Sequence, residues 1–85
     1  MKCMPKHMDY DCIQWNWNFV EVNEFCRGKI NWREKLEGKL ILYGEYGPQS
    51  NQEIKLGDYI IKKNEFNFEV LDEASFNKMY DIIGK

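Results

Sequence analysis

The sequence predicts an α+β domain: a small, mostly antiparallel sheet with one helix after the first strand and a C-terminal helix. Several short segments alternate apolar and polar residues with a period of two, which is typical of half-buried strands. Two other segments repeat apolar residues at helical spacing. With 85 residues, the chain has room for one core only. We therefore expect a single domain over residues 6–85, preceded by a loose leader over residues 1–5.

The first strand is expected within residues 6–15, which read KHMDYDCIQW. Tyr10 and Cys12 alternate there with Asp9 and Asp11, so the apolar side chains share one face and the acidic ones share the other. Paired carboxylates can serve acid–base chemistry, but on such a strand they are more commonly a solvated face. We therefore expect Asp9 and Asp11 to lie on a solvent-exposed strand face and to have no catalytic role.

A short amphipathic helix is expected next, between Asn18 and Gly28. Asn18 and Glu21 have the spacing of a capping box, in which two side chains satisfy the first free backbone amides. Phe19 and Val22 follow on one face at helical spacing. Gly28 can adopt the left-handed conformation that commonly ends a helix.

Five strands are predicted in the middle of the chain, separated by turn and loop residues. Glu37–Lys39 and Gly57–Asp58 are turns, and residues 47–51, which read GPQSN, have the composition of a loop. Gly57 tolerates a positive φ, and the side chain of Asp58 can bond nearby backbone amides. The expected strands lie around residues 30–32, 40–43, 52–56, 59–63 and 68–71.

The C-terminal helix is predicted from apolar residues spaced i, i+3, i+4 and i+7, namely Phe76, Met79, Tyr80 and Ile83. Asp72 lies where an N-terminal cap belongs, and Gly84 lies where a helix would stop. We therefore expect one helix from Asp72 to Gly84.

The composition excludes some classes of protein. The chain has 12 basic and 14 acidic residues and a net charge of -2, which argues against a general nucleic-acid-binding protein. No stretch approaches the roughly 18 apolar residues of a membrane span, and the N-terminus lacks the apolar run of a signal peptide. We therefore expect no membrane association and a cytoplasmic location.

Metal and catalytic sites have little support in the sequence. The possible zinc ligands are Cys3, His7, Cys12 and Cys26. Their spacing matches no zinc ribbon or finger, so we expect free thiols and neither a metal nor a cofactor. The chain has no Thr and only one His, and its glycines lack the spacing of a phosphate-binding loop. We expect no catalytic residues and no enzyme activity.

Three blocks of sequence carry a resemblance to known proteins. Residues 13–15 read Ile-Gln-Trp, residues 57–62 read Gly-Asp-Tyr-Ile-Ile-Lys, and Phe76 and Tyr80 are spaced as Phe-x-x-x-Tyr. In these blocks the chain resembles a family of small, uncharacterised proteins encoded by tailed phages, many of which infect Gram-positive hosts. The block at residues 57–62 is the most specific.

The resemblance runs from Lys6 to Ile83 and is interrupted by a variable middle over residues 32–51. The chain also departs from the family at residues 70–73, where the family reads Pro-Cys-Lys-Pro and this chain reads Val-Leu-Asp-Glu. Any chemistry that depends on that Cys or Lys is therefore missing here.

The resemblance implies a phage accessory protein that acts in the host cytoplasm, with no activity to carry over. Small non-enzymatic phage proteins often act against host immunity. We therefore expect the chain to counter host defence, and sequestration of a nucleotide-type immune signal is the preferred hypothesis. The alternatives are an inhibitor that occludes a host nuclease or sensor, and a minor virion component.

The candidate binding residues combine aromatic rings, which stack on nucleobases, with basic groups, which pair with phosphates. The set is Trp17, Trp32, Arg33, Tyr43, Tyr46 and Lys62, with Lys55 and Lys63 as further basic residues. Because Lys62 and Lys63 are adjacent in a strand, only one can face a given pocket.

Two other roles fit the same residues. The rings fit half-buried sheet positions, with the lysines as solubilising groups, and the rings also fit anchors for a protein partner. A core this small cannot bury all of the aromatic side chains. We therefore also expect a homo-oligomer, in which a subunit interface covers the exposed ones.

Overall fold

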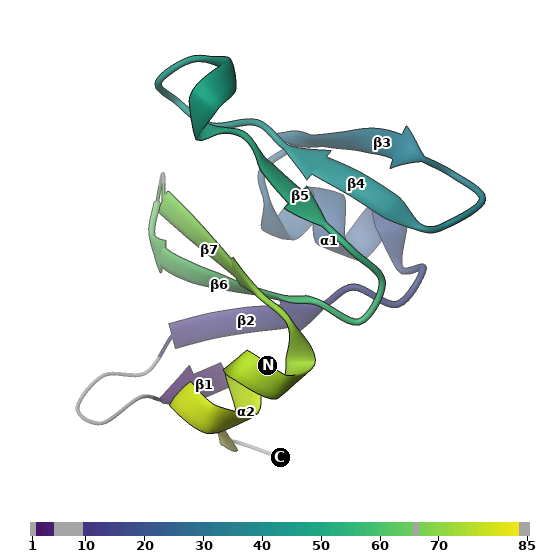
Figure 1. Ribbon diagram of the computed structural model, residues 1–85. Coiled ribbons are helices and arrows are strands. Elements are labelled where there is room, and N and C mark those ends of the chain that lie inside the picture. Colours follow the sequence, from purple (N-terminus) through teal and green to yellow (C-terminus); the bar gives the residue numbers. More distant parts are fainter. Residues whose placement is uncertain (1, 5–9, 66, 84–85) are drawn as a thin grey trace.

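A computed structural model describes residues 2–4, 10–65 and 67–83. Within these residues the chain forms β-strands, two α-helices and a short 3₁₀ helix, and it therefore has the predicted α+β class (Figure 1). In chain order they are β1 (Lys2–Met4), β2 (Tyr10–Gln14), α1 (Phe19–Phe25), β3 (Ile30–Glu34), β4 (Lys39–Leu42), η1 (Pro48–Ser50), β5 (Gln52–Ile54), β6 (Tyr59–Asn64), β7 (Asn67–Leu71), α2 (Glu73–Met79) and β8 (Asp81–Ile83).

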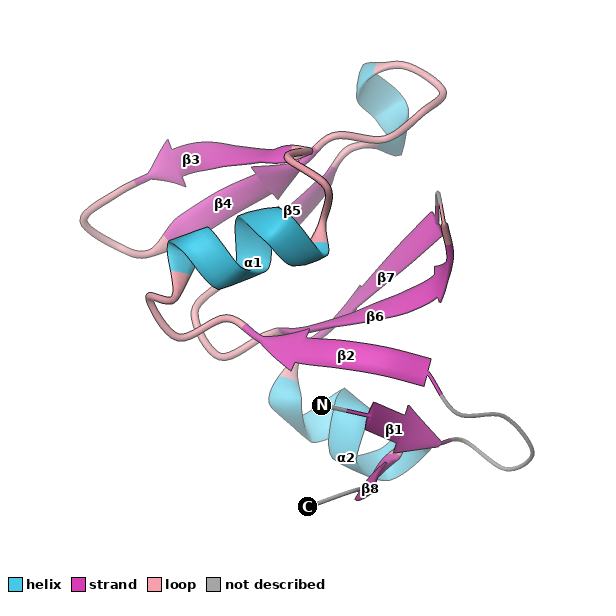
Figure 2. Ribbon diagram, turned by 180° about the vertical axis from the view of Figure 1, so that it is seen from behind, coloured by secondary structure: helices cyan, strands magenta, loops and turns pink. Residues whose placement is uncertain are grey.

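The strands pair in antiparallel fashion, as predicted, but they form two sheets. One sheet has the order β7-β6-β2-β1-β8 and the other has the order β3-β4-β5. Figure 2 shows α1 lying between the two sheets on one side of the molecule, where it contacts β2. The middle of the chain therefore builds a sheet of its own, packed against a sheet whose strands come from the two ends of the chain.

The five-stranded sheet is buried on both faces, so the protein has two cores. Ile60 faces the first core, which lies between the two sheets and α1, whereas Tyr59 and Ile61 face the second core beneath α2. This explains why Tyr59, Ile60 and Ile61 are apolar in succession, because a strand covered on both sides has no polar face. The first core is centred on the fully buried Trp15, and the second on Phe76.

The Ile-Gln-Trp block of residues 13–15 and the Gly-Asp block at residues 57–58 meet in the folded chain. The Trp15 amide donates to the Asp58 carbonyl at 2.9 Å, and the Gly57 amide donates to the Trp15 carbonyl at 2.8 Å. The Gln14 side chain also donates to the Gly57 carbonyl at 3.1 Å. These residues connect the end of β2 to the β5–β6 turn, and they therefore serve the scaffold.

Both ends of the chain differ from the sequence prediction. Residues 1–5 are predicted to be a loose leader, but Lys2–Met4 forms β1, which pairs with β2 and β8 and buries the Cys3 side chain. The predicted C-terminal helix ends at Met79, because Tyr80 adopts an extended conformation and Asp81–Ile83 continues as β8. Pairing with β1 satisfies backbone groups of both short strands, so it overrides the helical spacing of the last apolar residues.

Helix α1 agrees with the prediction at its end but not at its start. The Gly28 amide donates to the Asn23 carbonyl at 2.8 Å, and Gly28 has a φ of 77°, as expected for a glycine that ends a helix. The Asn18 side chain instead accepts from the Asn16 amide at 2.9 Å, so the predicted capping box does not form. In the part of the chain that the structure describes, no helix has both the length and the apolar character needed to cross a membrane.

Candidate functional site

Four aromatic rings gather where α1 meets the three-stranded sheet, and we call them the aromatic cluster. They are Trp15, Trp17, Phe19 and Trp32. The Trp15 and Trp32 ring centres are 5.6 Å apart, and Phe19 stacks on Trp32 at 4.9 Å. Edge-on and stacked arrangements at these distances are favourable, so the four rings stabilise one another's positions.

The turn of residues 35–38 is fixed against this cluster. The buried Trp15 indole nitrogen donates to the Gly38 carbonyl at 2.6 Å. The Trp17 ring lies directly over Gly38, where an added Cβ would come within 3.0 Å of the ring. A side chain at residue 38 would therefore have to displace the Trp17 ring slightly and adopt an unfavourable φ of 69°.

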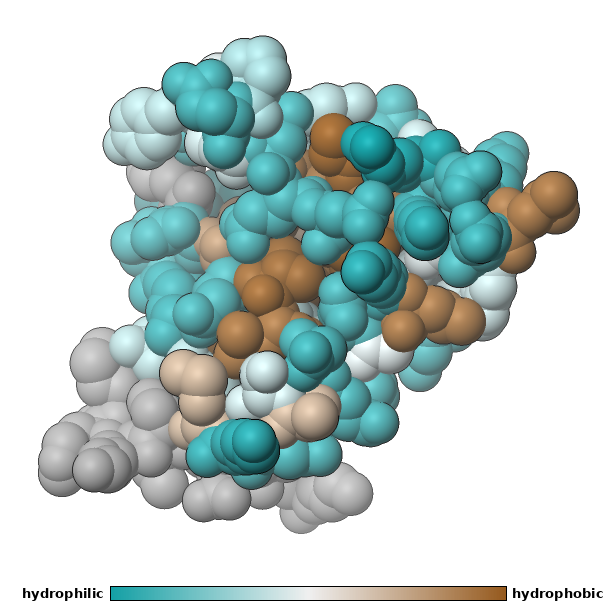
Figure 3. All heavy atoms as spheres, viewed as in Figure 1, coloured by the Kyte–Doolittle hydropathy of each residue, from teal (hydrophilic) through white to brown (hydrophobic). Residues whose placement is uncertain are grey.

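Trp17 is strained and half-exposed. Its φ is 76°, a left-handed conformation that is rare for a bulky side chain, and 52% of its surface is exposed. Val20, in the first turn of α1, is 70% exposed, and Leu36, in the turn fixed by Trp17, is 98% exposed. We call Trp17 and Leu36, which are linked by the contact of the Trp17 ring with Gly38 in the turn of residues 35–38, the Trp17 surface. Figure 3 shows hydrophobic side chains at the tip of the β3–β4 hairpin.

A separate cleft lies between the loop of residues 43–51 and the end of the β6–β7 hairpin. It has a volume of about 390 Å³. Leu42 and Phe68 supply apolar lining, and Tyr43 and Tyr46 supply aromatic rings. Its polar lining residues are Lys29, Glu45, Ser50, Gln52, Asn64 and Asn67.

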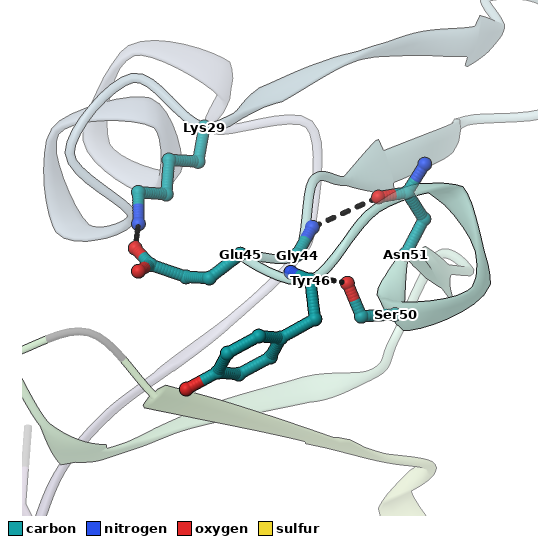
Figure 4. A network of polar contacts seen from close by, with 6 residues as sticks. All are labelled: Lys29, Gly44, Glu45, Tyr46, Ser50 and Asn51. Atoms are coloured by element: carbon teal, nitrogen blue, oxygen red, sulfur yellow. Dashed lines mark hydrogen bonds and ion pairs between the residues drawn. The ribbon is translucent and has the colours of Figure 1, made fainter.

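The loop beside this cleft is held in place by its own side chains (Figure 4). The Asn51 oxygen accepts from the Gly44 amide at 2.8 Å, and the Ser50 hydroxyl accepts from the Tyr46 amide at 3.1 Å. The Gln49 amide nitrogen donates to the Tyr46 carbonyl at 2.9 Å. Tyr46 is 83% exposed, and Figure 4 shows its ring directed from the loop towards the β6–β7 hairpin.

The predicted basic residues lie away from both features. Arg33 is exposed and pairs with Glu53 at 3.1 Å beside a second, shallower hollow on the three-stranded sheet. Lys62 lies opposite Asp11 in the β2–β6 pairing and is not among the residues that line the cleft. Lys55 precedes the β5–β6 turn, where its backbone amide donates to the Asp58 carboxylate at 2.8 Å. Asp58 is thus a turn residue.

Lys63 belongs to a polar network on the α2 side of the five-stranded sheet. Its ammonium donates to the Tyr80 hydroxyl at 2.6 Å, and that hydroxyl donates to Glu69 at 3.0 Å. The ammonium also lies 4.6 Å from the centre of the Tyr10 ring. Burial lowers the pKa of Lys63, but the bonds to Tyr80 and Glu69 outweigh it, so the pKa is raised. A lysine kept charged in this way stabilises the fold and is not a nucleophile.

The cysteines divide between the two cores. Cys3 and Cys12 lie in the second core and Cys26 lies in the first, while His7 is outside the described residues. Burial raises the pKa of Cys12 and of Cys26 to about 12. At neutral pH these thiols are protonated, and a protonated thiol is a poor nucleophile.

The six predicted binding residues therefore lie in separate places. Trp17 and Trp32 share the aromatic cluster, and Tyr43 and Tyr46 share the cleft. Arg33 and Lys62 join neither group. Sequence reasoning missed the exposed Leu36 and the amides that line the cleft, because a single Leu in a turn and scattered Asn and Gln residues give no periodic signal. Neither a family model, nor a curated protein, nor a solved structure matches this chain.

Proposed function

We propose that the protein is a non-enzymatic phage accessory protein that counters host defence by binding and blocking a host protein through the Trp17 surface. The observation that carries this proposal is Trp17 itself, a large ring held half-exposed in a strained backbone conformation. Such strain persists only where the surroundings impose it, and it is concentrated at functional sites.

A protein partner fits the chemistry of this surface. Tryptophan is among the residues most enriched at the energetic centre of protein interfaces, where charged residues form the surrounding rim. Trp17 and Leu36 are apolar and exposed, and Lys35 and the Glu37–Lys39 ion pair lie in or beside the same turn. The ring is already packed in place, so binding would order few side chains.

Sequestration of a nucleotide signal by the predicted residues has less support. That mechanism needs stacking rings and cationic groups at one site, but Arg33 is paired with Glu53 and lies apart from Tyr46, across separate hollows. Of the two anti-defence mechanisms that the sequence leaves open, the geometry therefore favours the protein-blocking one. A role in the host cytoplasm remains part of the proposal.

The test is co-purification from host cells with matched variants. The tagged chain is produced in a bacterial host, and retained proteins are quantified by mass spectrometry for the wild type and for the double variant Trp17→Asn with Leu36→Asp. Asn tolerates the left-handed conformation of residue 17, so the fold should persist, which circular dichroism checks. Tyr46→Ala is the control, because it removes a still more exposed aromatic ring outside the Trp17 surface.

We expect a defined host protein to be retained by the wild type and by Tyr46→Ala, and to be lost from the double variant. Size-exclusion chromatography with light scattering shows whether the partner is instead a second copy of the chain, as the predicted homo-oligomer requires. Equal retention of every protein by the double variant and the wild type would contradict the proposal.

A further inference from the structure

The cleft beside Tyr46 has the size of a small-molecule site. Its volume of about 390 Å³ lies within the range of ligand pockets, which is about 300–1,000 Å³. Leu42 and Phe68 give it apolar walls, and several polar side chains surround them. It shares no residue with the Trp17 surface, so it is a second, independent feature of the molecule.

One wall of the cleft is an aromatic ring with no role in either core. Tyr46 is 83% exposed and belongs to neither cluster of buried residues. The loop that carries it is nevertheless fixed, because Gly44 packs so closely on Ser50 that an added Cβ would lie 2.0 Å from the hydroxyl oxygen. The ring is therefore presented by a preorganised loop, which reduces the entropy lost when a flat molecule stacks on it.

The opposite side of the cleft offers carboxamide groups. The Gln52 amide nitrogen donates to the Phe68 carbonyl at 3.0 Å, which fixes the side chain and leaves its oxygen as an acceptor. Asn67 adds an exposed carboxamide from β7. Carboxamides supply a donor and an acceptor side by side, which matches the hydrogen-bonding edge of a nucleobase.

The charge of the cleft selects against phosphate. Of the described residues that line it, Lys29 and Glu45 are the charged ones, and they form an ion pair with each other (Figure 4). Tight phosphate binding relies on charge-assisted hydrogen bonds from cationic groups. Here the one ammonium is already neutralised by a carboxylate, and that carboxylate would repel an anion.

We propose that this cleft binds a neutral molecule that carries a nucleobase, a nucleoside rather than a nucleotide. The base stacks on Tyr46, and the carboxamides of Gln52 and Asn67 bond its polar edge. This inference does not depend on the proposed function, because different residues carry each of them.

The experiment is a titration of the ¹⁵N-labelled protein followed by NMR. The probes are adenosine, guanosine, cytidine and uridine, each compared with its 5′-monophosphate. We expect at least one nucleoside to cause saturable shifts confined to residues 43–52 and the β6–β7 hairpin, with its monophosphate binding several-fold more weakly. The proposal is overturned if no nucleoside causes saturable shifts there, or if the monophosphate binds more tightly than the nucleoside.

Variants then test the assigned roles. Tyr46→Ala should weaken nucleoside binding about fivefold to a hundredfold, the usual effect of removing one stacked ring, whereas the Phe variant should retain most of it. Glu45→Gln removes the carboxylate from the cleft and should shift the preference towards the monophosphate. Glu53→Gln, which breaks the Arg33 ion pair outside the cleft, is the matched control and should change neither affinity. Unaltered binding by Tyr46→Ala would overturn the stacking role.

Discussion

Trp17 and Tyr46 both carry exposed aromatic rings, but different contacts fix the positions of the two rings. The Trp17 ring is 6.0 Å from the buried Trp15 ring and lies on Gly38, which Trp15 itself binds. Tyr46 is held by hydrogen bonds within its own loop, to Ser50 among others. The position of Trp17 is therefore coupled to the first core, whereas the position of Tyr46 depends on a local segment. Global destabilisation should disturb both rings, and a loop mutation should disturb only Tyr46.

The largest loss in the free energy of unfolding should come from raising the pH. Raising the pH ionises the thiols of the two cores and does not act on the hydrogen bonds of the Tyr46 loop. Burial raises the pKa of Cys12 and of Cys26 to about 12, above the thiol value of the unfolded chain. The folded state thus holds these protons more tightly, so the stability linked to them is complete below about pH 8.5 and is lost as the pH rises towards 12. The two thiols together should cost about 6 kcal/mol by pH 11.

Urea denaturation at several pH values between 8 and 11 measures this loss. Cys26→Ala should be less stable than the wild type at pH 8. It should lose less stability as the pH rises, because it has only one of the two buried thiols, that of Cys12, left to ionise. A wild-type stability that does not change between pH 8 and pH 11 would contradict the burial of the thiols.

Trp15→Phe should break the support of Trp17 directly. The change leaves the buried Gly38 carbonyl without the indole donor and opens space in the first core. We expect a loss of about 3 kcal/mol in the free energy of unfolding. Urea denaturation gives the value, and Trp17→Asn, which alters the half-exposed ring instead, should cost less. A loss below about 1 kcal/mol would show that the two tryptophans are not coupled as described.

Gly44→Ala should disturb the loop of Tyr46 and leave the aromatic cluster intact. The new Cβ would lie 2.4 Å from the Ser50 carbonyl oxygen, so the backbone of the loop has to shift. We expect a cost of about 2 kcal/mol and faster hydrogen exchange at the Tyr46 amide. Gly57→Ala is the control, since open space surrounds it, and only its left-handed φ should cost about 1 kcal/mol. An undisturbed Tyr46 amide in Gly44→Ala would contradict the close packing.

The smallest effects should come from the exposed residues themselves. Leu36→Asp and Tyr46→Ala each alter a side chain that is at least 83% exposed, so each should change the free energy of unfolding by no more than about 0.5 kcal/mol. Thermal and urea denaturation measure both. A clearly larger loss in either variant would mean that the residue supports the fold, and its assignment to a binding surface would then fail.

Much of the fold follows from local pattern, which the sequence displays directly. The apolar run at Tyr59–Ile61 predicts a strand, and Gly57–Asp58 predicts the turn before it, because both depend on neighbouring residues. Long-range pairing is invisible to such patterns. The sequence of Lys2–Met4 does not predict that this segment pairs with β8. That pairing accompanies the end of the C-terminal helix at Met79.

The candidate sites were harder to predict for the same reason. Aromatic and basic residues can be counted from the sequence, but their distances depend on the tertiary fold. Arg33 pairs with Glu53 from another strand, which removes it from the predicted set of phosphate ligands. Trp17 is one of the predicted binding residues and is half-exposed in the structure, yet its left-handed backbone and its contact with Gly38 are encoded by no local pattern.

Plaque formation tests most directly whether the Trp17 surface acts against host defence, as we propose. Host strains that each carry one defence system would produce the wild-type chain, the Trp17→Asn with Leu36→Asp variant, or Tyr46→Ala, and would be challenged with a phage that the system restricts. We predict that the wild type and Tyr46→Ala restore plaques in at least one strain and that the double variant does not. Restoration by the double variant, or by no form of the protein, would contradict the claim.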